Sequence, residues 1–497
     1  QARHAIRRNY PILAHLRFLL EKVRPEIRQY FIESDTEAAP YSRAQRAIVY
    51  QRAKRALETR PLGTQLDVYA PGYEWIHHSV NPAPACDPDF RITIGGDGEY
   101  ANPGVSRPYS ASVLNISAMS FGALSANAIR ALNRGAKLGG FAHDTGEGSV
   151  SRYHREFGGD LVWEIGSGYF GCRTQDGRFD ADKFARQANE AQIKLVEIKL
   201  SQGAKPGHGG MLPGAKVTVE IAEARGVAQG EDCISPPFHS AFSTPIEMLH
   251  FVDKLRQLSG GKPTGFKFCV GHPWEWFALA KAMHETGVLP DFIVVDGGEG
   301  GTGAAPVEFT DHVGMPLREG LTLVRNTLVG LGLRERIRIG ASGKMVTAFD
   351  LARAMALGAD WCNMARGFMF AVGCLQALTC HTGRCPTGVT TQDPLRQRAL
   401  VVGDKTERVR RFHDNTLKAL KELVQAAGLQ HPKEISAFHI VRRTSEDHEV
   451  RLLANLLPFV KPGQLLEAAE GRQDWPHAVF KLYWPIASSD SFAARMG

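Results

Sequence analysis

The sequence predicts an α/β fold, a (β/α)8 TIM barrel with an N-terminal helical and irregular extension and a C-terminal helical extension. Two observations predict it. From Ser112 onward, eight short apolar runs end in turns rich in Gly, Ser or Thr, and a helical pattern follows each turn. Such barrels carry their chemistry on the loops after the strands, which is where the Gly-rich segments fall. The predicted strands are Val113–Ser117, Gly140–His143, Leu161–Ile165, Val196–Leu200, Phe266–Val270, Phe292–Val295, Ile337–Ile339 and Trp361–Met364.

The segments on either side of the predicted barrel differ from it in hydrophobic pattern and composition. Apolar residues recur at three- and four-residue steps from Ile12 to Val23, which predicts a helix, and a second helix is expected over residues 43–57. Residues 61–109 are rich in Pro, Gly and aromatics, and we expect a wrapping segment with a few short strands. The predicted divisions are residues 1–109 for the arm and wrapping segment, 110–400 for the barrel, and 401–497 for a mainly helical extension.

Charge is distributed unevenly along the 497 residues. Residues 1–60 contain 13 Lys/Arg and 6 Asp/Glu, whereas the remaining residues contain 46 of each. A nucleic-acid-binding body would carry a basic face on the folded domain, so this class is excluded. No run of 18 apolar residues occurs, and eight cysteines are too few for a disulfide scaffold in so long a chain.

The basic arm has two interpretations. One is a solvated helix face. The other starts from the fact that the sequence begins with Gln1 and not with Met, so that a hydrophobic anchor could lie upstream. Basic residues just after such an anchor would lie at the inner face of the cytoplasmic membrane. A cytoplasmic protein, with the arm as a possible membrane-surface contact, is the resulting expectation.

Residues 337–367 carry the clearest cofactor signature. One strand ends in Ala-Ser-Gly-Lys, a helix follows, and the next strand ends in Ala-Arg-Gly. This is the usual phosphate cradle after strands 7 and 8, where backbone amides bind phosphate oxygens. An ordinary strand–helix unit is the alternative, but the paired arrangement favours flavin mononucleotide (FMN). The predicted residues are Ser342, Gly343, Lys344, Ala365, Arg366 and Gly367.

Two further features point to the same cofactor. Gly300 and Gly301 belong to a five-glycine run after the sixth strand, which suggests backbone lying flat against a ligand rather than a flexible surface loop. Lys199, Lys205 and Lys267 lie in or just beyond the fourth and fifth strands. A lysine in an apolar strand needs a partner for its charge. We expect that partner to be the pyrimidine edge of a flavin, with a structural ion pair as the alternative.

Three cysteines, Cys374, Cys380 and Cys385, lie within 12 residues, with a proline after the last. Thiolates on such a loop suit an iron–sulfur cluster, and three ligands favour a three-iron cluster. Buried cysteines without a metal are the alternative. The other five cysteines are scattered and are interpreted as core residues.

Together these segments resemble the FMN-binding synthase domain of glutamate synthase, over about residues 110–400. The sequence motifs that carry the resemblance are SAMSFGALSANA (Ser117–Ala128), TGEG (Thr145–Gly148), QGAKPGHGGMLPGAKV (Gln202–Val217), ISPP (Ile234–Pro237), GGTGAAP (Gly300–Pro306) and CPTGVTTQDP (Cys385–Pro394).

The resemblance implies FMN beside a three-iron, four-sulfur cluster, and reduction of 2-iminoglutarate, formed from 2-oxoglutarate and ammonia, to L-glutamate. It places Met119 and Ser120 at the flavin and substrate. It makes Glu147 and Lys205 acid/base and carbonyl-polarising groups, with Ser120 also catalytic. The implied substrate-binding residues are Arg225, Met211 and Gly148, and the implied cluster ligands are Cys374, Cys380 and Cys385.

The chain departs from the family pattern at several positions. Met211 replaces a glutamine of the keto-acid pocket, His208 replaces an acidic residue, and GEGSVSRYH replaces GEGGE. An alkylamine-using, N-substituted glutamate synthase is therefore one alternative, with Met211 admitting the apolar group. A membrane-associated electron-transfer protein without synthase activity is another.

The sequence also bears on partners. It has neither an amidotransferase domain with its catalytic N-terminal cysteine nor a GxGxxG after a strand. We therefore expect an external electron donor, a ferredoxin or a reductase subunit. Ammonia is expected to be free or supplied by a glutaminase partner, and homo-oligomers are possible.

Overall fold

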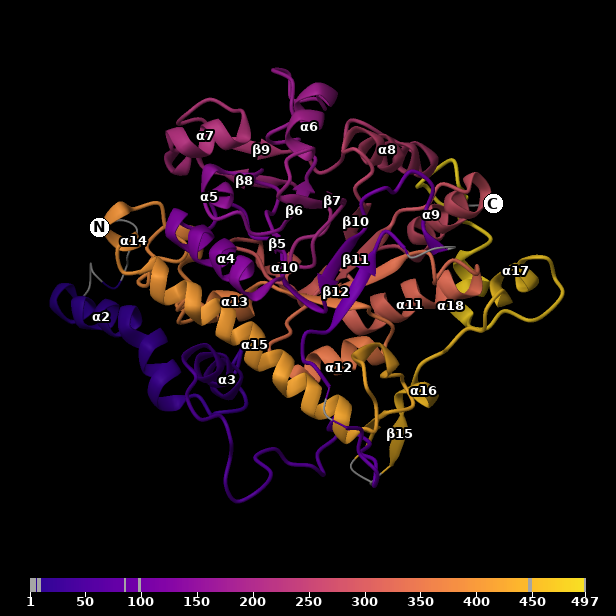
Figure 1. Cartoon of the computed structure of the whole chain (residues 1–497). Helices are drawn as coiled ribbons and strands as arrows, with labels where there is room; N and C mark the ends of the chain where they lie inside the picture. The colour runs from indigo at the N-terminus through magenta and orange to yellow at the C-terminus, as the bar shows by residue number, and fades with distance from the viewer. Residues whose placement is uncertain (1–5, 7–9, 85, 97–99, 446–448, 496–497) are drawn as a thin grey trace.

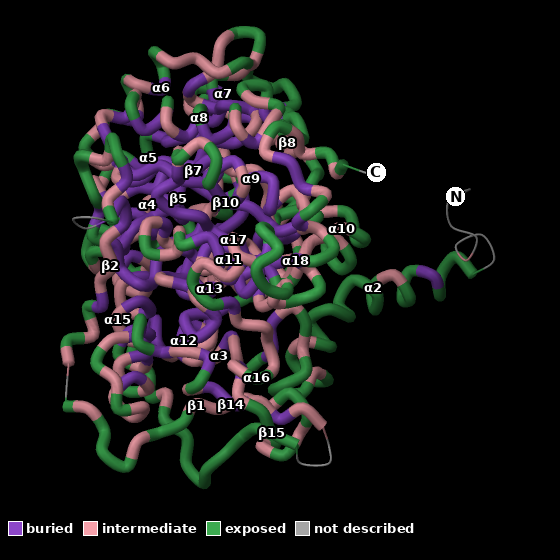
Figure 2. The backbone as a smooth tube through the Cα atoms, turned by 90° about the vertical axis from the view of Figure 1, so that its right-hand side faces the viewer, coloured by how far each residue is buried: buried purple, intermediate pink, exposed green. Residues whose placement is uncertain are grey.

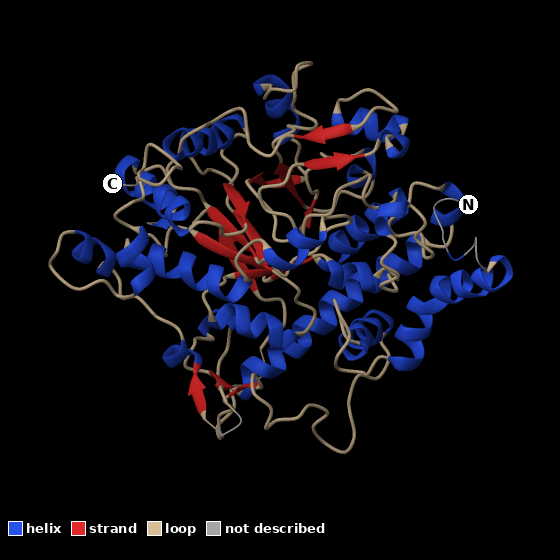
Figure 3. Cartoon of the chain, turned by 180° about the vertical axis from the view of Figure 1, so that it is seen from behind, coloured by secondary structure: helices blue, strands red, loops and turns tan. Residues whose placement is uncertain are grey.

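A closed barrel of eight parallel strands forms the centre of the chain, in the order β10-β11-β12-β13-β4-β5-β6-β7, with β7 paired to β10 (Figures 1 and 3). The computed structural model describes residues 6, 10–84, 86–96, 100–445 and 449–495, so residues 1–5 and 7–9 of the basic arm lie outside the described residues. The predicted barrel is confirmed. Its strands are β4 (Leu114–Ile116), β5 (His143–Asp144), β6 (Leu161–Ile165), β7 (Ile193–Lys199), β10 (Thr264–Phe268), β11 (Phe292–Asp296), β12 (Arg338–Ser342) and β13 (Trp361–Met364).

The second barrel strand is shorter than the sequence predicts. Gly140 adopts φ 68° and ends the preceding helix α4 (Ala126–Gly139), so its backbone is not available to a strand. β5 therefore begins only at His143, and it pairs with β4 through this residue. The predicted boundary was wrong because a C-capping glycine and a strand-opening glycine look alike in sequence.

The N-terminal end of the barrel is closed by apolar side chains. The antiparallel hairpin of β2 (Arg91–Ile94) and β3 (Tyr109–Ser112) lies there. Its Ile94 and Tyr109 belong to one buried cluster with Phe292 and Trp361. The opposite, C-terminal end carries the long loops, and in barrels of this kind the active site is built from these loops.

Helices surround the barrel (Figure 3). Two of them start with capping boxes, built by Thr244 with Glu247 and by Thr347 with Asp350, which satisfy backbone amides at the first turn. Besides α4, the helices of the ring are α6 (Ala181–Ala188), α8 (Pro245–Leu258), α9 (Pro273–Thr286), α11 (Leu317–Gly330), α12 (Ala348–Ala356) and α13 (Arg366–Ala371).

The longest insertion follows β7 and lies at the top of Figure 1. It contains the antiparallel pair β8 (Gly210–Leu212) and β9 (Cys233–Ser235), with the 3-10 turn η3 (Gly214–Lys216) and α7 (Val219–Arg225) between them. Short helical segments occur in other loops: α5 (Arg152–Arg155), α10 (Val307–His312), η4 (Cys380–Thr382) and α14 (Pro394–Gln397).

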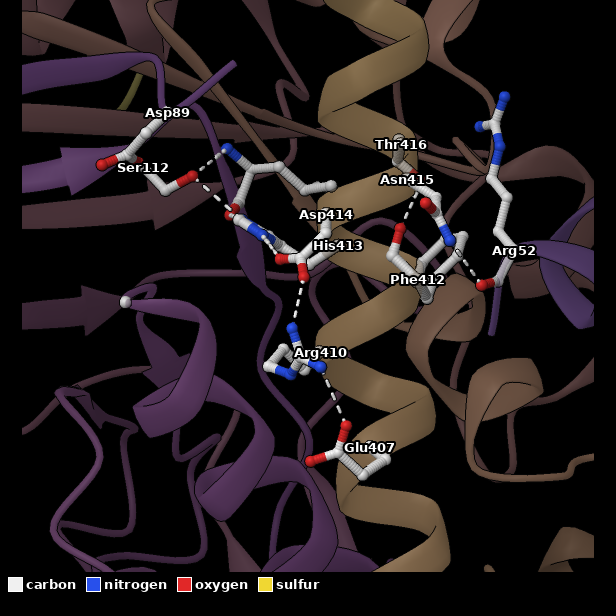
Figure 4. Close-up of polar contacts among 12 residues, drawn as sticks. Arg52, Asp89, Ser112, Glu407, Arg410, Phe412, His413, Asp414, Asn415 and Thr416 are labelled. Atoms are coloured by element: carbon white, nitrogen blue, oxygen red, sulfur yellow. Dashed lines mark hydrogen bonds and ion pairs between the residues drawn. The ribbon is translucent and has the colours of Figure 1, made fainter. Parts of the chain in front are cut away.

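The long helix α15 (Val402–Ala426) joins the barrel to the N-terminal arm (Figure 4). His413 Nε2 lies 3.0 Å from Ser112 Oγ, at the end of β3. Close by on the same helix, Asn415 Nδ2 donates to the backbone oxygen of Arg52, 2.9 Å distant, in α3 (Arg43–Lys54). The arm is thus held on the barrel through α15.

The C-terminal extension is not entirely helical. β14 (Ile440–Arg443) and β15 (Val450–Leu452) form a three-stranded antiparallel sheet with β1 (Glu74–Ile76) of the wrapping segment. The extension is mainly helical, as expected, but the sequence did not predict this sheet, because β14 pairs with a strand more than 350 residues earlier in the chain. The remaining elements are η5 (Pro432–Glu434), α16 (Leu453–Leu456), α17 (Gln464–Ala469) and α18 (Ala478–Tyr483).

Helix α2 (Pro11–Ile27) projects from the body of the molecule (Figure 2). The short π-helical segment η1 (Arg28–Ile32) follows it. In the described part of the chain, we find no helix whose length and apolarity would suit a membrane crossing.

Candidate functional site

Glu147 and Lys199 form an ion pair at the C-terminal end of the barrel. Lys199 closes β7, Glu147 lies in the loop after β5, and Lys199 Nζ is 3.1 Å from Glu147 Oε2. Burial would raise the pKa of Glu147, but Lys199, Arg225 and Lys205 outweigh it and bring the pKa to about 2. The carboxylate is therefore ionised at neutral pH.

Glycines let the loops close around this carboxylate. A Cβ added at Gly210 would lie 3.0 Å from Glu147 Oε1, and one at Gly166 would lie 3.0 Å from the Glu147 Cβ. A Cβ at Gly148 would lie 2.8 Å from the Ser120 Cβ and 3.2 Å from Arg225 Nη2. The structure thus brings the predicted residues Ser120, Glu147, Gly148 and Arg225 into one site.

Arg225, at the end of α7, is only 5% exposed. Its Nη2 donates to the backbone oxygen of Phe121, 3.3 Å away, and its guanidinium lies over the ring of Phe170. Its Nε has no hydrogen-bond partner, and the described residues include no acidic group in an ion pair with it. A buried guanidinium with unused donors is suited to a carboxylate brought by a ligand.

Lys205 adds a further cation beside Glu147. Burial, with Lys199 close by, lowers its pKa, whereas Glu147 raises it. Lys199, Lys205 and Arg225 therefore surround one carboxylate, which leaves an excess of positive charge. Such a site favours a ligand with two negative charges.

Met211 is not brought to this group. It is 64% exposed on β8, opposite Ile234 of β9. Because side chains alternate along a strand and Gly210 faces Glu147, Met211 points the other way. The sequence did not reveal this, because the two-residue period of so short a strand is not visible in a Gly-rich loop.

Lys267 of β10 has carboxylate partners inside the barrel. Its ammonium contacts Glu164 of β6 and lies 3.6 Å from Glu197 Oε1 of β7. Asp144 completes the group, and burial, with Glu164 beside it, raises the pKa of Asp144 to about 7. Lys267 therefore has the structural ion pair that was the alternative to a flavin contact.

The acidic residues of this barrel-interior group were not singled out from the sequence. Asp144, Glu164 and Glu197 are fully buried. The available signal was an acidic residue within each of the apolar runs LVWEI and KLVEI.

Two cationic side chains, Lys344 and Arg366, lie close together at the predicted phosphate cradle. Lys344 follows Gly343 in a left-handed conformation (φ 50°), and Arg366 Nη2 donates to the backbone oxygen of Glu299, 2.9 Å away. Burial and the neighbouring Arg366 lower the pKa of Lys344. A Cβ added at Gly301 would lie 2.9 Å from the Arg366 guanidinium, so the glycine loop lies directly on it. Two adjacent cations of this kind suit a dianion such as a phosphate monoester.

The other predicted cofactor residues lie around the same end of the barrel. Ser342 Oγ is 3.4 Å from Ser117 Oγ. Gly300 donates to the Gly297 oxygen at 2.8 Å, and a Cβ at Gly146 would lie 3.0 Å from the carbonyl carbon of Met119. Ala365 and Gly367 stand at the start of α13.

The three predicted metal ligands lie near one another. Burial raises the pKa of Cys374 to about 12, with Cys380 and Cys385 contributing. Burial would raise the pKa of Cys385 too, but hydrogen bonds with Thr387 and Thr390 lower it overall. Among the described residues, the one set of three ligand atoms within 4.8 Å of each other is Asp144, Glu164 and Glu197. The thiols are thus more widely spaced than that set.

Comparison with known proteins assigns the family. The model of the conserved region in glutamate synthase matches residues 106–430. The chain is 39% identical, over 92% of its length and 93% of the relative, to the glutamate synthase large subunit-like protein YerD of Bacillus subtilis (strain 168). It is 38% identical to the archaeal-type glutamate synthase [NADPH] of Thermotoga neapolitana, over 56% of this chain and 52% of the relative. The chain therefore spans about half the length of the archaeal-type relative.

Among solved structures, the chain is similar to a mutant of mandelate oxidase with the monooxide FMN adduct. That similarity has a TM-score of 0.43 at 12% identity, and it covers 87% of this chain and 99% of the other. The assignment rests instead on the family model and on the full-length relative. By both, the chain belongs to the glutamate synthase family of oxidoreductases.

Proposed function

We propose that this protein is a cytoplasmic FMN- and iron–sulfur-dependent glutamate synthase, which reduces 2-iminoglutarate, formed from 2-oxoglutarate and ammonia, to L-glutamate. The supporting observation is the charge of the site. Lys199, Lys205 and Arg225 face the single carboxylate of Glu147, and Arg225 keeps unused donors. A keto acid with two carboxylates would neutralise this excess.

The FMN proposal is supported by the cradle. Lys344 and Arg366 carry like charges at close range, and glycine permits the backbone to approach them at Gly301. A phosphate would relieve their repulsion, with Ser342 and Gly343 lining its site. When bound, FMN supplies the hydride chemistry.

The chain's own groups do the remaining work. In this proposal Arg225 binds one substrate carboxylate by a two-pronged contact, and Lys199 and Lys205 polarise the reacting carbonyl or imine. Lys205, whose pKa burial lowers, donates a proton. Glu147, ionised at neutral pH, accepts hydrogen bonds from the ammonia-derived nitrogen.

The three-iron, four-sulfur cluster is proposed on the donor set. Cys374, Cys380 and Cys385 offer three thiols on one loop. Iron–sulfur clusters are held by cysteine thiolates, and a loop with three cysteines within 12 residues is suited to bind one. Electrons would reach it from an external donor, a ferredoxin or a reductase subunit. The ammonia would be free or come from a glutaminase partner.

The test uses the purified, anaerobically reduced protein, with absorbance reporting the flavin and electron paramagnetic resonance the cluster. We expect 2-oxoglutarate with ammonium to reoxidise the flavin and yield glutamate, and Glu147→Gln to slow this about 100-fold. Methylamine in place of ammonium tests the N-substituted alternative. Absence of reoxidation with any keto acid would overturn the synthase proposal and favour the electron-transfer alternative.

We also propose that α2 contacts a membrane surface. Its exposed apolar residues recur on one side of the helix: Ile12, Leu13, Leu16, Leu19, Leu20, Val23 and Ile27. Arg17, Lys22 and Arg24 accompany them, and a basic amphipathic helix is suited to lie in the headgroup region of an anionic bilayer.

A further inference from the structure

Tyr41 belongs to the N-terminal arm, yet its side chain lies at the cofactor cradle. It is 1% exposed, with its ring edge-on to Phe370 of α13 at a centroid distance of 5.2 Å. The Arg366 guanidinium lies 4.8 Å from the ring centroid, and Lys344 Nζ lies 5.9 Å from it. The two cations of the cradle thus share one aromatic ring.

The backbone of the same residue holds the cysteine loop. The Tyr41 amide donates to Gln376 Oε1 at 3.1 Å, and Gln376 Nε2 donates back to the Tyr41 oxygen at 3.0 Å. The backbone N–H of Gln376 in turn donates to the Cys374 sulfur, 3.4 Å away. One residue of the arm therefore connects the cradle to a thiol of the cysteine loop.

Two further hydrogen bonds join the arm to the cysteine loop. Tyr50 Oη donates to the backbone oxygen of Cys374 at 2.6 Å, and Gln29 Nε2 donates to the oxygen of Leu375 at 2.9 Å. The arm thus contacts three consecutive residues, 374–376.

The position of Tyr41 is fixed by its surroundings. Ser42 and Gln45 form a capping box that starts α3 directly after Tyr41. Asn415 of α15 then holds the other end of α3 through the Arg52 oxygen. Because the helix that follows Tyr41 is held at both ends, the Tyr41 ring can form a rigid wall beside the two cations.

The electrostatics match this role. Burial raises the pKa of Tyr41 to about 12, although Arg366 opposes the rise, so the phenol stays neutral. A neutral ring attracts the cations through its face without neutralising them. Their charge remains available for a phosphate, while the ring excludes water from one side.

We propose that Tyr41 is a positioning residue for both cofactors: it covers the phosphate end of FMN and, through Gln376, fixes the cysteine loop. The basic arm is then part of the cofactor site rather than an appendage. This inference rests on the proposed function for the identity of the two cofactors.

The first experiment separates the phosphate end from the rest of the flavin. We would measure the Kd of the flavin-free protein for FMN and for riboflavin, in the wild type, Tyr41→Phe and Tyr41→Leu. Tyr41→Leu should weaken FMN binding about tenfold and leave riboflavin binding unchanged. Tyr41→Phe keeps the ring and should match the wild type. Equal weakening of both ligands, or no weakening of either, would overturn the role at the phosphate.

The second experiment reads the cysteine loop without flavin. We would follow alkylation of Cys374 by iodoacetamide, located by mass spectrometry, in the cluster-free full-length chain. Gln376→Leu should speed this reaction at least threefold, whereas Gln397→Leu, a change outside the contact, should not. An unchanged rate would contradict the arm–loop tie. A wild type that binds neither FMN nor riboflavin would instead overturn the proposed function, and the alkylation result would still stand.

Discussion

Arg225 and Arg173 lie over the same aromatic ring. Their guanidinium carbons are 5.1 and 5.6 Å from the ring centroid of Phe170, but only Arg225 is in the group with Glu147. The pair therefore offers a variant and a matched control.

Arg225→Lys should raise the KM for 2-oxoglutarate by on the order of 100-fold, because an ammonium cannot make the two-pronged contact with a carboxylate. Arg173→Lys makes the same exchange on the same ring and should change KM less than threefold. Steady-state kinetics with varied 2-oxoglutarate provide the measurement. Equal effects of the two variants would remove Arg225 from the substrate site.

Asp144 supplies a test in pH. Its pKa in the folded chain is raised to about 7 from 3.8, so between these values the folded state binds more protons than the unfolded state. Stability should therefore fall as pH rises from about 4 to about 7 and should not fall further from this cause above it. Asp144→Asn keeps a neutral side chain and should gain stability relative to the wild type over that window.

Urea unfolding midpoints of the wild type and Asp144→Asn at pH 5 and pH 8 provide the measurement for this prediction. Asp311→Asn, an exposed change, is the control and should show no such pH dependence. A constant difference between Asp144→Asn and the wild type at the two pH values would show that the barrel interior does not hold the proton at Asp144.

The cysteine loop predicts a metal result. Cys385→Ser should lose the cluster signal in electron paramagnetic resonance and lower the iron content, because an alcohol is a poor ligand for a soft iron–sulfur centre. Cys86→Ser, at a half-buried cysteine of the wrapping segment, should keep both. Full iron content in Cys385→Ser would contradict the ligand assignment.

Helix α2 predicts a membrane result. Co-sedimentation of the wild type with vesicles containing anionic lipid should fall about tenfold in the double variant Leu16→Glu/Leu19→Glu, because both side chains belong to the exposed apolar side. Leu66→Glu, at an exposed leucine away from α2, is the control. Equal sedimentation of all three proteins would leave the solvated-face interpretation of the arm.

Much of the fold could be predicted from the sequence. Eight apolar runs, each followed by a Gly-rich turn, predicted the eight barrel strands, because a parallel barrel buries every strand and repeats its loops at one end. The pairing of β1 with β14 could not be predicted in this way. Short strands far apart in sequence carry no local mark of their partner.

The candidate site could also be predicted only in part. The sequence motifs around Glu147, Lys205 and the cysteines identified the residue types and the family. They could not show that Gly210 rather than Met211 faces Glu147, because that depends on how a three-residue strand lies over the barrel.

The sequence by itself determined the barrel, the family and the residue types of the candidate site. Only the tertiary structure decided which charged side chains lie next to which partners. It paired Lys267 with Glu164, left Arg225 without an acidic ion-pair partner among the described residues, and brought Tyr41 to Arg366 across more than 300 positions. The physical reason is that the energy of a charge depends on the distance to its neighbours and on burial, and both are set by packing between segments.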